Sequence, residues 1–108
     1  MNSFANTPKP PYYAVIFTSI KINEDMGYSK MSKRMLELLS KQEGFLGFES
    51  AREELGITVS YWDSLDSIKK WKSNLEHKEA QRKGREIWYK EYKIRIAKVE
   101  QDYDFKKL

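Results

Sequence analysis

The first predicted element is a segment with apolar side chains on both of its faces. Residues 12–22 (YYAVIFTSIKI) are rich in β-branched and aromatic residues, which favours a β-strand. A strand with one wet face alternates between apolar and polar residues, but here neither face is polar. We therefore expect both faces to be covered, the second one by another subunit. The two faces carry Tyr13, Val15 and Phe17 on one side and Ala14, Ile16, Ile20 and Ile22 on the other.

The next segments predict a helix and then a hairpin. Residues 28–42 place apolar side chains on one stripe at helical spacing, and Gly44 follows as a stop signal. Residues 45–53 (FLGFESARE) and 57–62 (ITVSYW) predict two strands joined by a turn at 54–56. Gly56 is available for a positive φ in that turn.

The second half of the chain predicts two helical segments and a last strand. One helix begins after the capping pair Asp63-Ser64 and is broken or bent at residues 74–77. A further helix covers about 78–89. Residues 93–103 (KIRIAKVEQDY) alternate between apolar and polar side chains and predict the last strand.

The predicted order of elements is β-α-β-β-α-β. This is the split, ferredoxin-like pattern of the α+β class, with one antiparallel sheet and both helices on one of its faces. The two-sided first strand then predicts that the other face is buried in a homodimer, as a dimeric α/β-barrel, or binds something flat. We expect an extended and partly mobile N-terminal arm at 1–11, a domain at 12–103 and a charged tail at 104–108.

Composition narrows the classes of protein. At 108 residues, one domain with an ordinary core is expected, and 40% hydrophobic residues argue against disorder throughout. The chain has no cysteine and one histidine, His77, which excludes disulfides, thiolate sites and a multi-histidine metal centre within one subunit. No signal peptide or apolar run of membrane-spanning length is visible, so we expect a cytoplasmic protein without a membrane partner.

Charge is concentrated in one part of the chain. Residues 69–98 hold eleven Lys or Arg and four Glu, a local net charge of +7, against +4 for the whole chain. Such a segment can bind nucleic acid, but interleaved glutamates also fit the solvated face of a helix. The GFLGFES segment at 44–50 resembles an RNA-stacking motif but falls on the second strand instead of the third. We therefore expect no nucleic-acid partner.

Four stretches of the chain resemble the antibiotic biosynthesis monooxygenase (ABM) family, and within it small stand-alone bacterial proteins. They are PPYYAVIFTS (10–19), EGFLGFESARE (43–53), ITVSYWDSLDSIKKWK (57–72) and EHKEAQRKGREIWYKEY (76–92). The resemblance implies a ferredoxin-like homodimer with a pocket between the sheet and the helices of each subunit. Some relatives oxidise aromatic substrates with O₂ and no metal or flavin, others open the haem ring, and others process quinols or signal molecules.

The resemblance to haem-degrading relatives implies a histidine ligand about ten residues after the helix tryptophan, and an asparagine on the first strand. Trp71 matches the tryptophan, but Gln81 stands at the ligand position. The first strand has Thr18 and Ser19 where the asparagine is needed. Glutamine is a poor ligand for haem iron, which weakens this interpretation. A bend of the helix near residue 74 could still bring His77 to the ligand position.

A cofactor-free oxygenase needs an apolar pocket and a group that forms and holds the substrate anion. His77 suits proton transfer near neutral pH, and Asn74 could donate to a developing oxyanion. These two are the candidate catalytic residues. The candidate substrate-binding residues are Trp71, Trp62 and Tyr61. Each has a plainer interpretation, as core packing for the aromatic residues and as a surface or capping residue for His77 and Asn74.

The function that we predict is a monooxygenase acting on a small aromatic or quinone-like compound, with no metal and no cofactor. The first alternative is a dimer that binds a small hydrophobic ligand without turnover. Haem binding or haem degradation is the second alternative. The prediction of function rests on the resemblance, whereas the prediction of fold also rests on the pattern of the residues.

Overall fold

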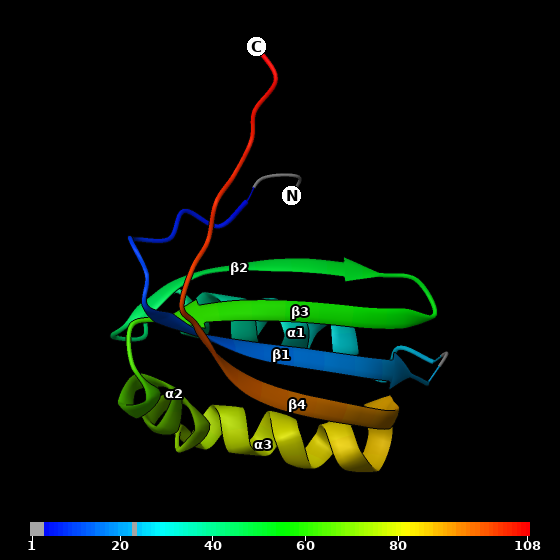
Figure 1. The fold of residues 1–108 in the computed structure, drawn as a ribbon. Coiled ribbons are helices and arrows are strands. Elements are labelled where there is room, and N and C mark those ends of the chain that lie inside the picture. The colour runs from blue at the N-terminus through cyan, green and yellow to red at the C-terminus, as the bar shows by residue number, and fades with distance from the viewer. Residues whose placement is uncertain (1–3, 23) are drawn as a thin grey trace.

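A four-stranded antiparallel sheet forms one layer of the molecule (Figure 1). The structure is a computed structural model that describes residues 4–22 and 24–108. In the sheet the strands follow the order β2-β3-β1-β4, with the two central strands β3 and β1 flanked by β2 and β4. This order confirms the predicted ferredoxin-like α+β fold. The strands are β1 (Tyr12–Lys21), β2 (Phe45–Arg52), β3 (Leu55–Trp62) and β4 (Tyr89–Val99).

The helices form the second layer, on one face of the sheet (Figure 1). Helix α1 (Tyr28–Leu39) connects β1 to β2, and helices α2 (Leu65–Lys72) and α3 (Leu75–Lys83) connect β3 to β4. One π-helical turn, η1 (Gly84–Trp88), continues α3 directly into β4. The sequence therefore predicts the kinds of element and their order correctly.

Capping side chains separate α2 from α3. The Ser64 hydroxyl accepts a hydrogen bond from the amide of Ser67 at 3.1 Å and begins α2. Asn74 Oδ1 accepts from the amides of Glu76 (3.0 Å) and His77 (3.2 Å) and begins α3. Both caps satisfy amides that have no partner inside the first helical turn. The break predicted near residue 74 is confirmed.

Pairing between the strands decides which side chains face the helices. Val15 of β1 pairs with Ser60 of β3 and with Ile96 of β4. Two residues further along β1, Phe17 pairs with Thr58 and Ile94. Because side chains alternate along a strand, these residues share the helix-facing side, and their neighbours in sequence share the outer face.

The core lies where α1 and α2 meet the sheet. Trp62 at the end of β3 is fully buried, and its indole stacks on Trp71 of α2 with 6.5 Å between ring centroids. Leu39 and Ile68 complete the buried cluster. The indole N–H of Trp62 donates to the hydroxyl of Ser60 at 3.0 Å, so the buried donor is satisfied.

Three predicted boundaries differ from the structure in the first half of the chain. The first helix ends at Leu39 and not at residue 42. The hairpin turn is only residues 53–54, since β3 already begins at Leu55. Gly56 therefore lies within a strand, and its φ is not positive. Gly44 does have a positive φ, 84°, in the turn that leads from α1 into β2.

The last strand begins and ends four residues earlier than predicted. It starts at Tyr89 because η1 leads into the sheet without a loop. It ends at Val99, which pairs with Tyr12, the first residue of β1. The residues before Tyr12 are Pro10 and Pro11, which have no amide N–H to pair with a longer β4.

Both ends of the chain meet at Tyr12. Its hydroxyl donates to Asp102 at 2.5 Å, and Thr7 donates to the same hydroxyl at 3.2 Å. Beyond this contact residues 103–108 extend away from the sheet (Figure 1). The predicted arm at 1–11 lies partly outside the described residues, but the amide of Ala5 donates to Glu49 at 2.9 Å. In the described parts of the chain, all helices are too short or too polar to cross a bilayer.

The core position of Trp62 yields a stability prediction. Replacing Trp62 by Ala removes a fully buried ring and leaves a cavity beside Trp71, so the free energy of unfolding falls by about 3–5 kcal/mol. Urea denaturation measures this loss. Leu75→Ala is the control, because Leu75 is 82% exposed and its loss changes stability by less than about 0.5 kcal/mol. Equal effects of the two substitutions would contradict the assigned core.

Candidate functional site

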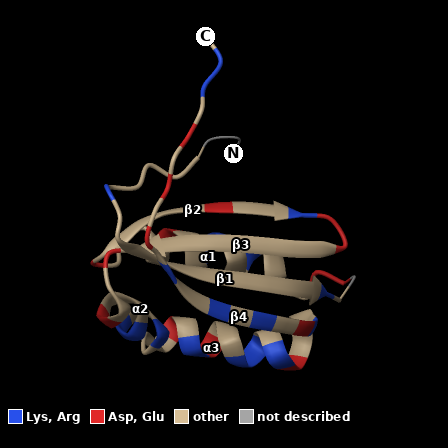
Figure 2. Cartoon of the chain, in the orientation of Figure 1, with Lys and Arg blue, Asp and Glu red and all other residues tan. Residues whose placement is uncertain are grey.

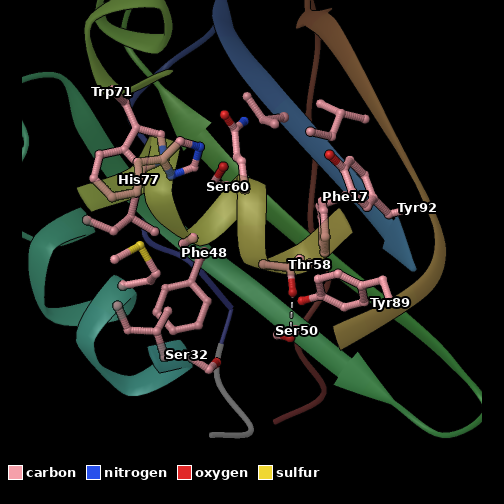
Figure 3. A pocket seen from close by; sticks show the side chains of 18 of the residues that line it. Phe17, Ser32, Phe48, Ser50, Thr58, Ser60, Trp71, His77, Tyr89 and Tyr92 are labelled. Carbon is pink, nitrogen blue, oxygen red and sulfur yellow. Dashed lines mark hydrogen bonds between the residues drawn. The ribbon is translucent and has the colours of Figure 1, made fainter. Parts of the chain in front are cut away.

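A cavity of about 480 Å³ lies between the helix-facing side of the sheet and the helices (Figure 3). Its floor consists of alternate residues of neighbouring strands, and its roof comes from α1, α2, α3 and η1. Most of the lining is apolar or aromatic, which is typical of a site for a small hydrophobic molecule. The floor residues include Val15, Phe17, Thr58, Ser60, Ile94 and Ile96.

Strand geometry gives the length of the cavity. Its floor runs from the cross-strand row of Ser60 to the row of Gly56, four residues along β3. At roughly 3.3 Å per residue these rows are about 13 Å apart. The cavity is therefore elongated, and its two ends can contact different parts of one ligand.

Trp71 and His77 form one end of the cavity (Figure 3). Their ring centroids are 4.4 Å apart, with an interplanar angle of 54°. The break between α2 and α3 produces this contact, because Asn74 caps the new helix and places His77 in its first turn. The two rings come from different helices, so their contact depends on the angle between α2 and α3.

Burial keeps His77 neutral. Removal from water lowers the pKa of His77 from 6.5 to about 4, and the ammonium of Lys72 contributes to the decrease. Nδ1 of the ring is buried and has no hydrogen-bond partner among residues 4–22 and 24–108. An unsatisfied buried polar atom costs about 1–3 kcal/mol. A ligand with an O–H or N–H group that reaches the ring would offset this cost.

Aromatic side chains form the opposite end. Phe17 lies 5.5 Å from Tyr89 and 5.4 Å from Tyr92, measured between ring centroids. The Tyr89 hydroxyl donates to that of Tyr28 at 3.3 Å. Burial, and then this hydrogen bond, raise the pKa of Tyr89, so its phenol stays protonated. Figure 3 shows these rings on the side of the cavity away from Trp71 and His77.

Polar groups on the floor lie between the two ends. The hydroxyls of Ser50 and Thr58 are 2.8 Å apart and form one hydrogen bond (Figure 3). Since each hydroxyl is both a donor and an acceptor, the pair can still bond to a polar atom of a ligand. An apolar cavity with a few polar groups of this kind orients its ligand.

The structure brings together only part of the predicted site. Trp71 and His77 line the cavity, whereas Asn74 does not line it and serves as the cap of α3. Trp62 is buried behind Trp71 and is core, not lining. The plainer interpretations of Asn74 and Trp62, as a cap and as packing, describe their contacts.

Tyr61 lies outside the cavity, which corrects its predicted place in the same pocket. It pairs with Ala14 and therefore points to the outer face, while its neighbour Trp62 points to the helices. On the outer face its hydroxyl donates to Glu49 at 2.7 Å, and burial together with this bond raises its pKa. Side chains of consecutive strand residues point to opposite faces of the sheet, so Tyr61 and Trp62 cannot both face the helices.

Sequence reasoning missed Phe17, Tyr89, Tyr92 and Arg52 as residues of the site. Phe17 could have been found, since it shares the helix-facing side with Tyr13 and Val15. Tyr89 and Tyr92 were hidden by the wrong start of the last strand. No local signal marks Arg52, because its place in the cavity depends on the pairing of β2 with β3.

The chain matches a family model and a bacterial relative. Residues 11–83 match the family model described as "Antibiotic biosynthesis monooxygenase". The chain is 52% identical over 102 residues to the uncharacterized protein YqjZ of Bacillus subtilis, a match that covers 93% of this chain and 90% of YqjZ.

Solved structures show the same fold at low identity. SnoaB of Streptomyces nogalater, described as a cofactor-independent oxygenase, superposes with a TM-score of 0.72 at 10% identity, covering 86% of this chain and 97% of SnoaB. A protein from Deinococcus radiodurans described as a putative antibiotic biosynthesis monooxygenase has a TM-score of 0.73 at 9% identity, covering 89% and 99% of the two chains. At these identities the likeness shows the fold alone.

The lowered pKa of His77 makes a prediction about acid stability. The unfolded chain binds a proton at this residue below about pH 6.5, but the folded chain binds one only near pH 4. The unfolded state then holds more protons, so stability falls as the pH drops from about 6.5 to 4 and levels off below. Because His77 is only partly buried, we expect a loss of about 1–2 kcal/mol.

His77→Gln tests this prediction, because glutamine does not titrate. Urea denaturation across the pH range should show a smaller loss of stability on acidification in the variant than in the native chain. Other groups titrate equally in both proteins, so the difference between their curves isolates His77. Parallel curves would mean that the imidazole is not held neutral by the fold.

Proposed function

The chain belongs to the antibiotic biosynthesis monooxygenase family, and we propose that it oxidises a small aromatic or quinone-like compound with O₂. The observation that carries the proposal is the pairing of Trp71 with a neutral His77 at one end of an elongated apolar cavity. Similarity of fold to SnoaB, described as a cofactor-independent oxygenase, supports a reaction without metal or flavin.

In this proposal the walls of the cavity hold the substrate by its ring faces. Trp71 at one end and Phe17 near the other offer aromatic surfaces, and aliphatic side chains of β1 and β4 fill the space between them. Each Å² of apolar surface that these contacts remove from water stabilises the complex by about 25 cal/mol. The Ser50–Thr58 hydroxyl pair would then orient a polar ring substituent.

His77 is the proposed proton acceptor. At neutral pH its imidazole is uncharged and can accept a proton from an acidic O–H or C–H of the substrate. The proton transfer creates an imidazolium and a substrate anion side by side, and the anion in turn raises the basicity of the ring. Asn74 is proposed as a positioning residue, since it holds the helix turn that carries His77.

The reaction balances without an added reductant. The substrate anion passes an electron to O₂, the two radicals combine, and a C–O bond forms to give a peroxide. The peroxide anion takes the proton back from the imidazolium of His77, and cleavage of the O–O bond with loss of the hydrogen on the same carbon releases water and leaves one oxygen atom in a quinone-type product. All of the electrons that reduce O₂ come from the substrate, which must therefore be electron-rich.

We also propose that two chains pair through the outer face of the sheet. Leu55 on this face is 49% exposed, although it lies on a central strand and pairs with Ile20 of β1. Burial of such a face against its own copy would remove an exposed apolar patch. The cavity lies on the opposite side of the sheet and stays open in this arrangement.

Oxygen uptake tests the proposed oxidation. Naphthols and hydroquinones are supplied to the purified protein, and His77→Gln should lower the turnover of any accepted substrate by about 100-fold, the usual contribution of a general base. Tyr61→Phe is the control, because Tyr61 lies on the outer face and turnover should stay unchanged. Equal turnover of native protein and His77→Gln would remove His77 from the mechanism. Binding without any oxygen uptake would instead favour a binding protein.

Haem binding is a second candidate, because His77 brings an imidazole to the cavity wall. The fit is partial: the ring is neutral, as a ligand must be, but Gln81 stands at the spacing that haem-degrading relatives use for histidine. Haem bound there would supply the chemistry of oxygen activation. The contribution of this chain would be an imidazole nitrogen of His77 to hold the iron and the apolar walls of the cavity to hold the ring.

A hemin titration distinguishes the two candidates. We expect no saturable shift of the Soret band, because the position expected for the ligand carries glutamine. A stoichiometric shift that is lost in His77→Gln would place haem binding first. Tyr61→Phe again serves as the control for unspecific binding of hemin to the outer face.

A further inference from the structure

We propose that the substrate carries an anionic group and that Arg52 binds it at the end of the cavity away from His77. This inference deepens the proposed function, because it names the charge and the polarity of the compound that enters the cavity. The candidate compound is an aromatic acid, with its acidic group at one end and its oxidised ring at the other.

The charges in the cavity are all positive. Arg52 at the end of β2 and Lys72 at the end of α2 line it. Among the described residues that line the cavity there is no aspartate and no glutamate. A cavity with apolar walls and charges of one sign attracts ligands of the opposite sign. A neutral quinol would leave both cations without a partner.

Arg52 lies in a space on the sheet, called its seat below, that is formed by Gly56 and Ser19. Arg52 pairs with Gly56 of β3, and Gly56 pairs with Ser19 of β1. The guanidinium of Arg52 donates to the hydroxyl of Ser19, which is only 1% exposed. A Cβ atom at Gly56 would overlap the guanidinium carbon. Because Gly56 has no side chain, it leaves the space in which the guanidinium lies.

This seat leaves most of the guanidinium free. A guanidinium has five N–H donors, and within the described residues Arg52 donates one hydrogen bond, to Ser19. Arg52 forms no ion pair with the described residues. In contrast, Nε of Arg34 lies 3.1 Å from Oε2 of Glu76, and a terminal guanidinium nitrogen of Arg82 lies 2.7 Å from Oε2 of Glu86. The planar fork of an arginine matches a carboxylate or a phenolate oxygen. Arg52 is thus held in place but not neutralised.

The two ends of the cavity then set the orientation of the ligand. Tyr92 lies in the same cross-strand row as Arg52, opposite Ser19. Ser60, near His77, lies about 13 Å away along the sheet. An acid held by Arg52 places the far end of a small ring system beside Trp71 and His77. The proton acceptor and the anion site therefore contact different ends of one molecule.

Two fluorescent probes with the same ring system test the anion site. Anilinonaphthalene sulfonate is an anion, and phenylnaphthylamine is its uncharged counterpart. At low ionic strength, where an exposed charge is least screened, Arg52→Gln should weaken sulfonate binding about tenfold. Binding of the uncharged probe should stay within about twofold, which also shows that the cavity is intact.

Two further variants separate the position of Arg52 from its charge. Gly56→Ala keeps the arginine but fills its seat, so the sulfonate should bind more weakly while the uncharged probe does not. Helix α3 carries charges of both signs (Figure 2), and Arg82→Gln removes one positive charge from it, which should leave both probes unaffected. Thermal unfolding of each variant confirms that the fold is retained.

Two results would overturn the proposal. One is an equal loss of sulfonate binding in Arg52→Gln and Arg82→Gln, which would indicate a general effect of net charge. The other is unchanged sulfonate binding in Arg52→Gln, which would place the anion elsewhere. Neither result depends on turnover, so the anion site can fail while oxygen uptake through His77 persists, and it can be supported when no oxidation is found.

Discussion

The structure depends on one constraint: successive side chains of a strand point to opposite faces of the sheet. It assigns Val15, Phe17 and Ser19 of β1 to the helices and their neighbours to the outer face. Cross-strand pairing then aligns these residues into rows, and the rows build the cavity floor from the core at Trp62 to the seat of Arg52. A shift of one residue in a single strand would exchange cavity and outer face.

The same constraint explains what could be predicted from the sequence. The β-branched and aromatic runs of β1 and β3, and the caps before α2 and α3, are local signals, and the fold follows from them. Trp71 and His77 were found because Trp71 matches the helix tryptophan of relatives and His77 is the only histidine in the sequence. Tyr61 was misplaced although the alternation of β3 already separated it from Trp62. Arg52 could not be found, since its seat exists only when β2, β3 and β1 are paired.

The side chains at the two ends of the cavity, His77 and Arg52, are buried to different extents, and this difference sets the chemistry of the site. Around His77 the removal of water favours the uncharged imidazole, and Lys72 adds to this effect. At the other end Arg52 is exposed, and its hydrogen bond to Ser19 directs the guanidinium. A neutral proton acceptor and a fixed cation can thus occupy one small cavity without opposing each other. Tyr89 lies at the same end as Arg52, where its phenol remains protonated and donates to the hydroxyl of Tyr28.

Gly56 has a consequence for comparisons across the family. Its φ is not positive, and the three atoms nearest to where a Cβ atom would lie all belong to Arg52, so the arginine accounts for a glycine there. In relatives that bind a neutral substrate, the arginine would no longer be required, and neither would the glycine that makes room for it. The two positions should therefore covary in an alignment of homologues, and a side chain at position 56 would mark relatives with a different ligand charge before any assay is made.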